Sequence, residues 1–326
     1  MKVCIIGAGA IGGFLGARLA LAGACDVSAV ARGATLAALQ AEGWRLRQDS
    51  TLWQAPARAV ADPAQLGVQD LIVIAVKGPA LADVARAIAP LVGPDSIVLP
   101  AMNGVPWWFG GGAEGGAAPL DSVDPGGRIA AAIARASVLG CVVHAAASSP
   151  EPGLVQHQMG RGLIIGEPDG GSSARAQRVC ELFADAGFEV THSPRIRYDI
   201  WYKLWGNLTT NPVSAMAGAT ADRLLDDELV RTFCVNAMQE ASDIGVRIGC
   251  RIEQTPVDRQ AITRRLGAFK TSMLQDAEAG RALELDSIVA AVCELGQRVG
   301  VATPNIDALL GLTRLFARTH GLYPPA

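Results

Sequence analysis

The stretch that decides the fold is MKVCIIGAGAIGGFLGARLALAG, residues 1–23. The apolar run at 3–6 predicts a strand, and the Ala- and Leu-rich segment at 11–22 predicts a helix. Between them the sequence fits G-x-G-x-x-G, a turn in which the first glycine permits the bend, the second admits a pyrophosphate and the third packs helix on strand. We expect a dinucleotide at Gly7, Ala8, Gly9, Ala10, Ile11 and Gly12. The alternative is a glycine-rich turn without a ligand.

The alternation of strand and helix continues to about residue 100. Strands are predicted at 27–31, 70–77 and 96–99, and helices at 35–42 and 79–91. The run DLIVIAVK at 70–77 is apolar on both faces, as a buried parallel strand requires. This pattern predicts an α/β fold with an N-terminal, Rossmann-like doubly wound sheet.

The pattern changes in the second half of the chain. Short strands at 138–145, 153–157, 163–166 and 188–191, with a helix at 174–186, are expected to complete the same sheet with antiparallel strands. Long helical segments then follow at 200–217, 226–248, 255–278, 284–299 and 305–319. We therefore expect a cofactor-binding domain at 1–194 and an all-helical domain for substrate binding and dimerisation at 195–326. The Gly-, Pro- and Ala-rich residues 109–127 are expected to form a mobile surface loop or lid.

Composition excludes several classes of protein. The chain has 326 residues, 50% of them hydrophobic and 18% charged, with a formal net charge of -3, which disfavours a disordered or nucleic-acid-binding protein. Seven scattered cysteines lack metal-ligand spacing, which predicts reduced thiols in the cytoplasm and no metal site. No apolar run approaches the roughly 20 residues that span a bilayer. A homodimer is expected only from the Ala- and Leu-rich composition of the helical half.

One basic residue, Arg32, favours NADP(H) over NAD(H), and a second, Lys77, is a candidate for contacting the cofactor. An NAD enzyme would carry a carboxylate about 20 residues after the glycine turn, for the ribose 2′-hydroxyl. Here Val30-Ala31-Arg32-Gly33 offers a guanidinium suited to a 2′-phosphate. Lys77 ends its strand at the same edge of the sheet and is a second candidate for the cofactor. Both residues could instead be solvated cations at strand ends.

A polar stripe provides candidates for the chemistry. Lys203, Asn207 and Asn211 are four residues apart, so a helix places them on one face among apolar neighbours. Asparagine is a poor helix former, which favours a cleft lining, and the lysine could protonate or stabilise an alkoxide. The alternative is a solvated stripe with Asn211 ending the helix before Pro212.

Two residues further along the chain remain ambiguous. Glu284 either complements a helix dipole or reaches a lysine or a substrate hydroxyl, and spacing alone favours the dipole. Ser272 is equally compatible with a site and with a helix surface.

Taken in order, these segments resemble the ketopantoate reductase family, the NADPH-dependent 2-dehydropantoate 2-reductases of pantothenate and coenzyme A synthesis. The resemblance covers nearly the whole chain. Its elements are the glycine turn, Arg32, Lys77, Asn103-Gly104, LGCVVHAA at 139–146, WYKLWGN at 201–207 with Asn211-Pro212, SMLQD at 272–276 and Glu284-Leu285-Asp286.

The resemblance implies a role for each matching residue. Lys203 would give a proton to the ketone oxygen of a 2-oxo acid, and Asn207, Asn211 and Ser272 would hold the substrate's carboxylate and hydroxyl. Asn103 would lie between cofactor and substrate. Glu284 would lie near the lysine and the nicotinamide, and Lys77 and the backbone at Ala146 would contact NADP(H).

Three departures leave the substrate open. Met102 precedes Asn103 where the family often has Gln, and an aromatic stretch, VPWWF at 105–109, follows at the expected cleft edge. Ala221 replaces an asparagine that holds substrate in some members. A reductase for a different branched 2-oxo acid and a non-catalytic NADP(H) sensor are therefore the alternatives, although a sensor would have no need of the polar stripe.

Overall fold

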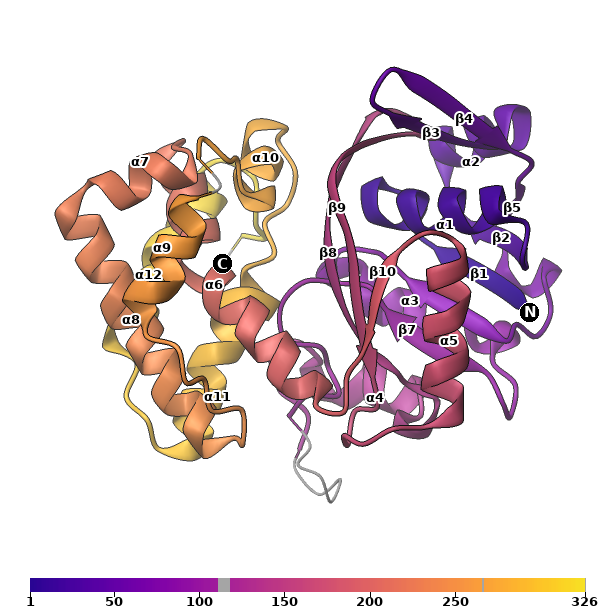
Figure 1. Ribbon diagram of the computed structural model, residues 1–326. Coiled ribbons are helices and arrows are strands. Elements are labelled where there is room, and N and C mark those ends of the chain that lie inside the picture. Colours follow the sequence, from indigo (N-terminus) through magenta and orange to yellow (C-terminus); the bar gives the residue numbers. More distant parts are fainter. Residues whose placement is uncertain (111–117, 266, 326) are drawn as a thin grey trace. The chain divides into compact units, whose positions relative to one another are not determined.

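The computed structural model of the chain describes residues 1–110, 118–265 and 267–325. It contains two compact units, one formed by residues 1–102 and 127–199 and the other by residues 103–126 and 200–326. The first carries a parallel sheet and the second is helical in its described part, so the predicted α/β class with a helical C-terminal half is confirmed (Figure 1).

The first unit is built on the parallel sheet predicted from the glycine turn. Its strand order is β5-β2-β1-β6-β7, and every neighbouring pair is parallel. The strands are β1 (Lys2–Ile6), β2 (Asp26–Val30), β5 (Arg58–Val60), β6 (Leu71–Ile74) and β7 (Ile97–Pro100). The helices of this unit are α1 (Ala10–Ala22), α2 (Gly33–Glu42), α3 (Leu81–Ala87), α4 (Arg128–Ala132) and α5 (Ala174–Asp185).

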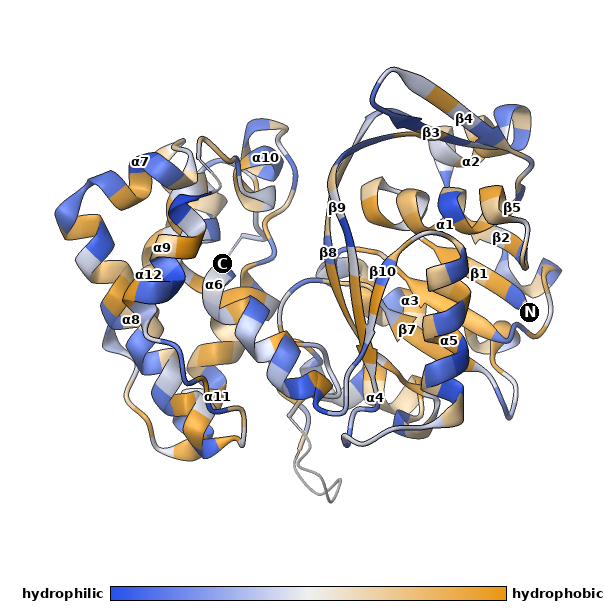
Figure 2. Cartoon of the chain, in the orientation of Figure 1, coloured by the Kyte–Doolittle hydropathy of each residue, from blue (hydrophilic) through white to orange (hydrophobic). Residues whose placement is uncertain are grey.

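Helix α1 lies between this sheet and a second one. Seven of its 13 residues are buried, and it is hydrophobic around most of its circumference (Figure 2). On one side, a Cβ at Gly12 would lie 2.9 Å from the Cβ of Ala75; on the other, a Cβ at Gly16 would lie 2.4 Å from the Trp44 ring. Glycine therefore allows the helix to approach both sheets closely. The helix ends at Gly23, which has a φ of 68°.

The sequence predicted that the later strands complete the first sheet, and this prediction is wrong. They form a second sheet of order β10-β9-β3-β4, with β8 also paired to β9. Only β8–β9 and β3–β4 are antiparallel, because β9 runs parallel to both β3 and β10. The strands are β3 (Trp44–Gln48), β4 (Thr51–Ala55), β8 (Gly140–Glu151), β9 (Leu154–Gly166) and β10 (Glu189–His192).

Two features explain the error. The strands β3 and β4 were not predicted, although buried Trp44 and Leu46 alternate with half-exposed Arg45 and Arg47 as a strand on a core requires. The segments 153–157 and 163–166 are one strand, β9, because its polar middle stays paired to β8 across a register shift near Ala146.

The second unit consists of α6 (Ile196–Ala217), most of which belongs to it, and the helices α7 (Ala221–Asp226), α8 (Glu228–Arg247), α9 (Pro256–Arg264), α10 (Ser272–Glu278), α11 (Ala291–Val299) and α12 (Pro304–Thr319). The helix predicted at 255–278 is two helices, because Thr271 caps a new start at α10. The helix predicted at 226–248 is α8, which begins at Glu228 because Asp227 caps it. Residues 286–290 are π-helical.

Residues 103–126 lie in the second unit, which departs from the two contiguous domains 1–194 and 195–326. The described parts of the expected loop or lid at 109–127 are anchored there: Phe109 and Leu120 are fully buried. The Glu294 carboxylate accepts hydrogen bonds from the backbone N–H groups of Asp121 and Ser122, at 3.0 and 2.9 Å. Residues 111–117 of that expected loop lie outside the described residues. No described helix is both long and apolar enough to cross a membrane.

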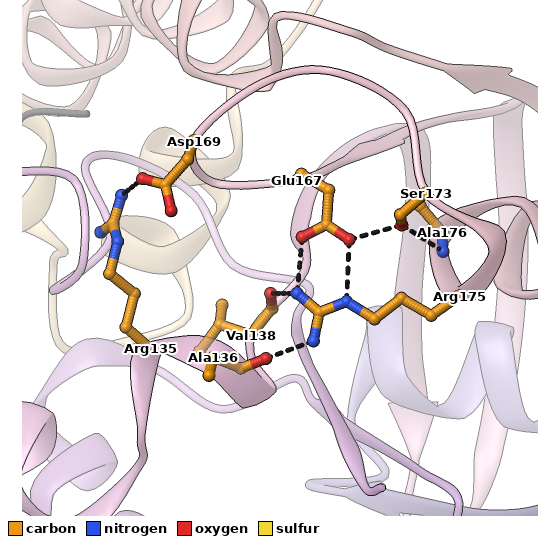
Figure 3. A network of polar contacts seen from close by, with 8 residues as sticks. All are labelled: Arg135, Ala136, Val138, Glu167, Asp169, Ser173, Arg175 and Ala176. Carbon is orange, nitrogen blue, oxygen red and sulfur yellow. Dashed lines mark hydrogen bonds and ion pairs between the residues drawn. The ribbon is translucent and has the colours of Figure 1, made fainter. Parts of the chain in front are cut away.

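A polar network holds the end of β9 in the first unit (Figure 3). The Arg175 guanidinium donates to both carboxylate oxygens of Glu167, at 2.8 and 2.5 Å, and to the backbone carbonyls of Ala136 and Val138. Ser173, the N-cap of α5, also donates to Glu167. Burial alone would raise the pKa of the Glu167 carboxyl, but the hydrogen bonds from Arg175 and Ser173 together hold it below its usual value.

We predict that Glu167→Gln lowers the free energy of unfolding by about 1–3 kcal/mol at pH 7, the range for hydrogen bonds to charged groups. Because the folded-state pKa is depressed, the carboxylate stabilises the wild type above its unfolded pKa, about 4.3, and this stabilisation disappears as pH falls through the folded value. Urea unfolding from pH 7 to pH 3 measures the difference.

The exposed pair Arg161–Glu189, at 3.5 Å, provides the matched control, because Glu189→Gln removes the same charge. That variant should lose less than about 1 kcal/mol, as surface pairs do. A difference between wild type and Glu167→Gln that stays constant down to pH 3 would show that the carboxylate charge is not what stabilises β9.

Candidate active site

The carboxyl edge of the parallel sheet gathers three of the predicted cofactor residues. Ile6 is paired in register with Val30 and with Ile74, so β1, β2 and β6 end side by side. Gly7, Arg32 and Lys77 follow these three strand ends. Ligands of open α/β sheets bind at this edge.

The three glycines of the turn have the distinct environments that a dinucleotide turn requires. Gly7 has a φ of 89°, and its N–H donates to the carbonyl of Val30 at 3.2 Å. A Cβ at Gly12 would lie 2.0 Å from the Gly7 carbonyl oxygen, so no larger residue fits. At Gly9, the exposed N-cap of α1, no described atom lies within 4 Å of an added Cβ. The backbone there is open to a phosphate, and the first N–H groups of α1 face the same end.

The remaining cofactor candidates are accessible to different degrees. Arg32 is exposed at the N-terminus of α2, and its guanidinium makes no hydrogen bond or ion pair with a described residue. Lys77 is half-buried and precedes a 3-10 turn at Gly78–Ala80. Ala146 lies on β8 between two register shifts, a bulge that interrupts the regular pairing of its backbone.

In the second unit, α6 carries the predicted polar stripe. Lys203 is half-buried, and its Nζ donates to the Asn103 side-chain Oδ1 at 2.8 Å. The structure therefore brings together two candidates that are 100 residues apart. The backbone just after Asn103 is also held in place, because Val105 N–H donates to the Ser287 carbonyl at 2.8 Å. This hydrogen bonding gives the ammonium a defined position.

The two asparagines of the stripe have side-chain amides without a hydrogen-bond partner among the described residues. Asn207 is half-buried, and Asn211 is only 4% exposed. Neither amide is among the buried side-chain atoms that lack a partner, so both keep some accessible surface and can hydrogen-bond a ligand at this face. Asn211 does not end the helix, because α6 continues through Pro212 to Ala217.

Ser272 is positioned by a chain of hydroxyl groups that the sequence did not reveal. Ser214 of α6 donates to the Asn211 carbonyl at 2.9 Å and contacts the Thr271 hydroxyl, which accepts from Leu274 N–H at 3.1 Å. Thr271 is the N-cap of α10, so the exposed Ser272 begins that helix with its backbone tied to α6.

Glu284 is half-buried just before the π-helical turn Asp286–Ala290. The C-terminal segment fixes this turn: Leu283 N–H donates to the Leu322 carbonyl at 2.9 Å, and the Tyr323 hydroxyl donates to Asp286 at 2.5 Å. Burial, with the hydrogen bond and charge of Asp286, raises the pKa of Tyr323 to about 12, so the hydroxyl remains a donor. Turns of π-helix are frequent at functional sites.

The aromatic stretch at 105–109 was expected at the edge of a cleft, and this expectation is wrong. Trp107 and Trp108 are 3% and 4% exposed and Phe109 is fully buried. The Phe109 ring stacks on Trp201 with ring centroids 6.1 Å apart. Phe109 thus packs on the apolar side of α6, and all three aromatic side chains are buried.

Six of the seven cysteines are buried and Cys25 is half-buried. None of the seven cysteines, all of which the structure describes, forms a disulfide, and burial raises the pKa of Cys4 and Cys234 to about 11 and that of Cys293 to about 12. Such thiols are poor nucleophiles at neutral pH. No group of three or more metal-ligating side chains occurs in the described part of the chain.

Comparisons with known proteins match both halves of the chain. The family model described as "Ketopantoate reductase PanE/ApbA" matches residues 3–170, and its C-terminal counterpart matches residues 195–317. A 2-dehydropantoate 2-reductase of Mesorhizobium japonicum is 45% identical over 99% of this chain and 100% of its own.

Solved structures similar to this chain point to the same family and fold. A chain from Ralstonia solanacearum MolK2, provisionally assigned as a ketopantoate reductase, has a TM-score of 0.94 and 55% identity, with 99% of each chain covered. A D-mandelate dehydrogenase crystallised with NADH and anilino(oxo)acetate has a TM-score of 0.85 at 20% identity, covering 99% of this chain and 100% of its own. The latter likeness concerns the fold alone.

The glycine turn generates a prediction that separates packing from ligand binding. In Gly9→Ala the new methyl group meets no described atom, so the melting temperature should change by less than about 2 °C while affinity for the nicotinamide dinucleotide falls about tenfold or more. In Gly12→Ala the methyl group meets the Gly7 carbonyl, which should cost about 1–3 kcal/mol and lower the melting temperature by several degrees. Scanning fluorimetry and NADPH fluorescence titration measure both effects. Equal thermal losses in the two variants would contradict the assignment.

Proposed function

The chain belongs to the ketopantoate reductase family, and from this we propose that it reduces 2-dehydropantoate to pantoate with NADPH. The observation that carries the proposal is the fixed ammonium of Lys203, held by Asn103 beside side-chain amides that have no described partner.

The first unit has features that fit the cofactor. The open backbone at Gly9 and the start of α1 suit the pyrophosphate, and the exposed Arg32 guanidinium suits a 2′-phosphate. A carboxylate for a ribose 2′-hydroxyl is missing from 30–33. NADPH, when bound, supplies the hydride that reduces C2 of the 2-oxo acid.

The second unit would hold the substrate and stabilise the negative charge that develops on its ketone oxygen. One ammonium proton of Lys203 is directed to Asn103, which fixes the orientation of the group. Lys203 would stabilise the oxyanion that develops there and donate its proton. Asn207, Asn211 and Ser272 would donate hydrogen bonds to the carboxylate and hydroxyl of the substrate. Glu284 would lie near the lysine, where it can influence the charge of the ammonium.

A reductase for another branched 2-oxo acid is the second candidate. It is favoured by Ala221, which lacks the amide that some family members use at this position. Ala221 is 1% exposed, and its backbone N–H donates to the Phe269 carbonyl at 3.0 Å. A hydroxyl at the far end of the substrate would therefore lack that hydrogen bond.

The proposal extends to cellular role and assembly. Pantoate made in the cytoplasm would supply pantothenate and coenzyme A synthesis, and rescue of a bacterial strain lacking its own reductase tests this role. A homodimer is proposed from three exposed leucines on α8 and α12, Leu229, Leu312 and Leu315, which are 82%, 59% and 62% exposed. Sedimentation velocity would show a monomer if this part is wrong.

We predict that Lys203→Ala lowers kcat about 10²–10⁴-fold and leaves NADPH affinity within about threefold, because only the general acid is lost. Lys203→Arg keeps the positive charge but transfers a proton poorly, so kcat should remain low. Lys2→Ala is the control, since Lys2 is an exposed lysine at the end of β1 away from the glycine turn. Steady-state NADPH oxidation gives the rates, and a nearly wild-type kcat in Lys203→Ala would exclude the assigned role.

Cofactor choice gives a separate prediction. Arg32→Ala should weaken NADPH binding about 10–100-fold and NADH binding by less than about threefold, because only NADPH carries the 2′-phosphate. Fluorescence titration with both nucleotides measures the two dissociation constants. Equal losses would mean that Arg32 has a structural role.

A further inference from the structure

One arginine of the second unit lies beside the polar stripe without an anionic partner. Arg259 is on α9, and its guanidinium carbon lies 5.3 Å from the centre of the Tyr202 ring on α6. The Tyr202 hydroxyl donates to Gln254 at 2.8 Å, so the ring that supports the guanidinium is itself fixed. Stacking of this kind holds an arginine fork in one orientation.

Gly206 allows the guanidinium to lie directly on the backbone of α6. A Cβ at Gly206 would lie 2.4 Å from the terminal NH2 nitrogen of Arg259 and 2.9 Å from its central carbon. Any larger residue at this position would displace the fork. The glycine in the middle of a helix is thereby explained, since it is otherwise unfavourable by about 1 kcal/mol.

The guanidinium makes no hydrogen bond or ion pair with any described residue. Its Nε is buried without a partner, and its two terminal nitrogens, also without partners, keep some accessible surface. An unpaired buried donor costs about 1–3 kcal/mol, more for a charged group. A fork held by stacking but not paired with a carboxylate is suited to bind an anion.

The helix places this fork next to the candidate substrate residues. Gly206 is three residues from Lys203 and four from Thr210, so these residues are surface neighbours on α6. Asn207 follows on the adjoining face, about 100° around the helix. The stripe contains one cation, Lys203, which the proposed reaction uses at the ketone oxygen. The carboxylate of a 2-oxo acid would then have only neutral donors unless a second cation is present.

We propose that Arg259 binds the substrate carboxylate and determines the preference for 2-oxo acids over uncharged ketones. The inference rests on the proposed function, since it assigns a binding residue within that reaction. Two charge-assisted N–H bonds from a planar fork would fix the carboxylate, while Lys203 acts at the neighbouring carbonyl.

The test compares the 2-oxo acid with an uncharged analogue. Kinetics with 2-dehydropantoate and with its lactone, which lacks the carboxylate, are measured at saturating NADPH for wild type and Arg259→Met. The KM for the acid should rise about 10–100-fold with kcat changed less than about threefold, and kcat/KM for the lactone should be unchanged. The KM of Arg259→Lys for the acid should lie between the values of wild type and Arg259→Met. Arg265→Met is the control, because Arg265 is an exposed arginine at the end of the same helix.

A second variant and a second measurement test the same inference independently of lactone turnover. Gly206→Ala keeps the arginine but displaces its fork, so it should raise the same KM without a matching loss of kcat. Calorimetric titration of pantoate into the NADP⁺-loaded enzyme should show the same 10–100-fold weakening in Arg259→Met, roughly as expected for a charge-assisted pair, whether or not the lactone is turned over.

Three outcomes would overturn the inference. An unchanged KM and pantoate affinity in Arg259→Met would show that the fork does not touch the substrate. Equal losses for acid and lactone would indicate a structural role. A wild-type enzyme inactive with every 2-oxo acid would contradict the proposed function itself, and the substrate assigned to Arg259 with it.

Discussion

The close packing of α1 between two sheets is the constraint on which the first unit depends. Gly12 permits contact with the parallel sheet, while Gly16 accommodates the Trp44 ring from the second sheet. The same helix begins at Gly9, whose backbone is open. A single run of small residues therefore serves two purposes: it brings the sheets together around one core and leaves one helix terminus accessible to a phosphate.

In the second unit, α6 has a comparable position. Its apolar side packs Trp201 against Phe109, and Trp205 donates its indole N–H to the Met238 carbonyl at 2.7 Å. These contacts fix the rotation of the helix about its axis, so the polar stripe on its other side has a defined direction. Asn103 accepts a hydrogen bond from Lys203 of that stripe, and the N-cap of α10, Thr271, contacts the Ser214 hydroxyl of the same helix. Rigid support of this kind is what a site needs in order to place a proton donor.

Local patterns in the sequence predicted the glycine turn, the parallel strands and the polar stripe, because each is expressed within about 20 residues. The second sheet was missed because β3 pairs with β9, more than 100 residues away, and no local signal specifies that partner. The burial of Phe109 was missed for the same reason. Arg259 gave no signal either, since its importance depends on Gly206, a residue without a side chain on a different helix.

The proposed function is tested most directly by comparing kcat/KM for 2-dehydropantoate, pyruvate, 2-oxoisovalerate and 2-oxoglutarate in steady-state NADPH oxidation. We expect a value for 2-dehydropantoate at least about 100-fold above the others, a ratio that a few matched contacts in a site supply. Faster turnover of one of the other acids would contradict the assigned substrate and retain the reductase. Cofactor binding with no turnover of any acid would contradict the catalytic role of Lys203 and indicate a protein that only binds the nucleotide.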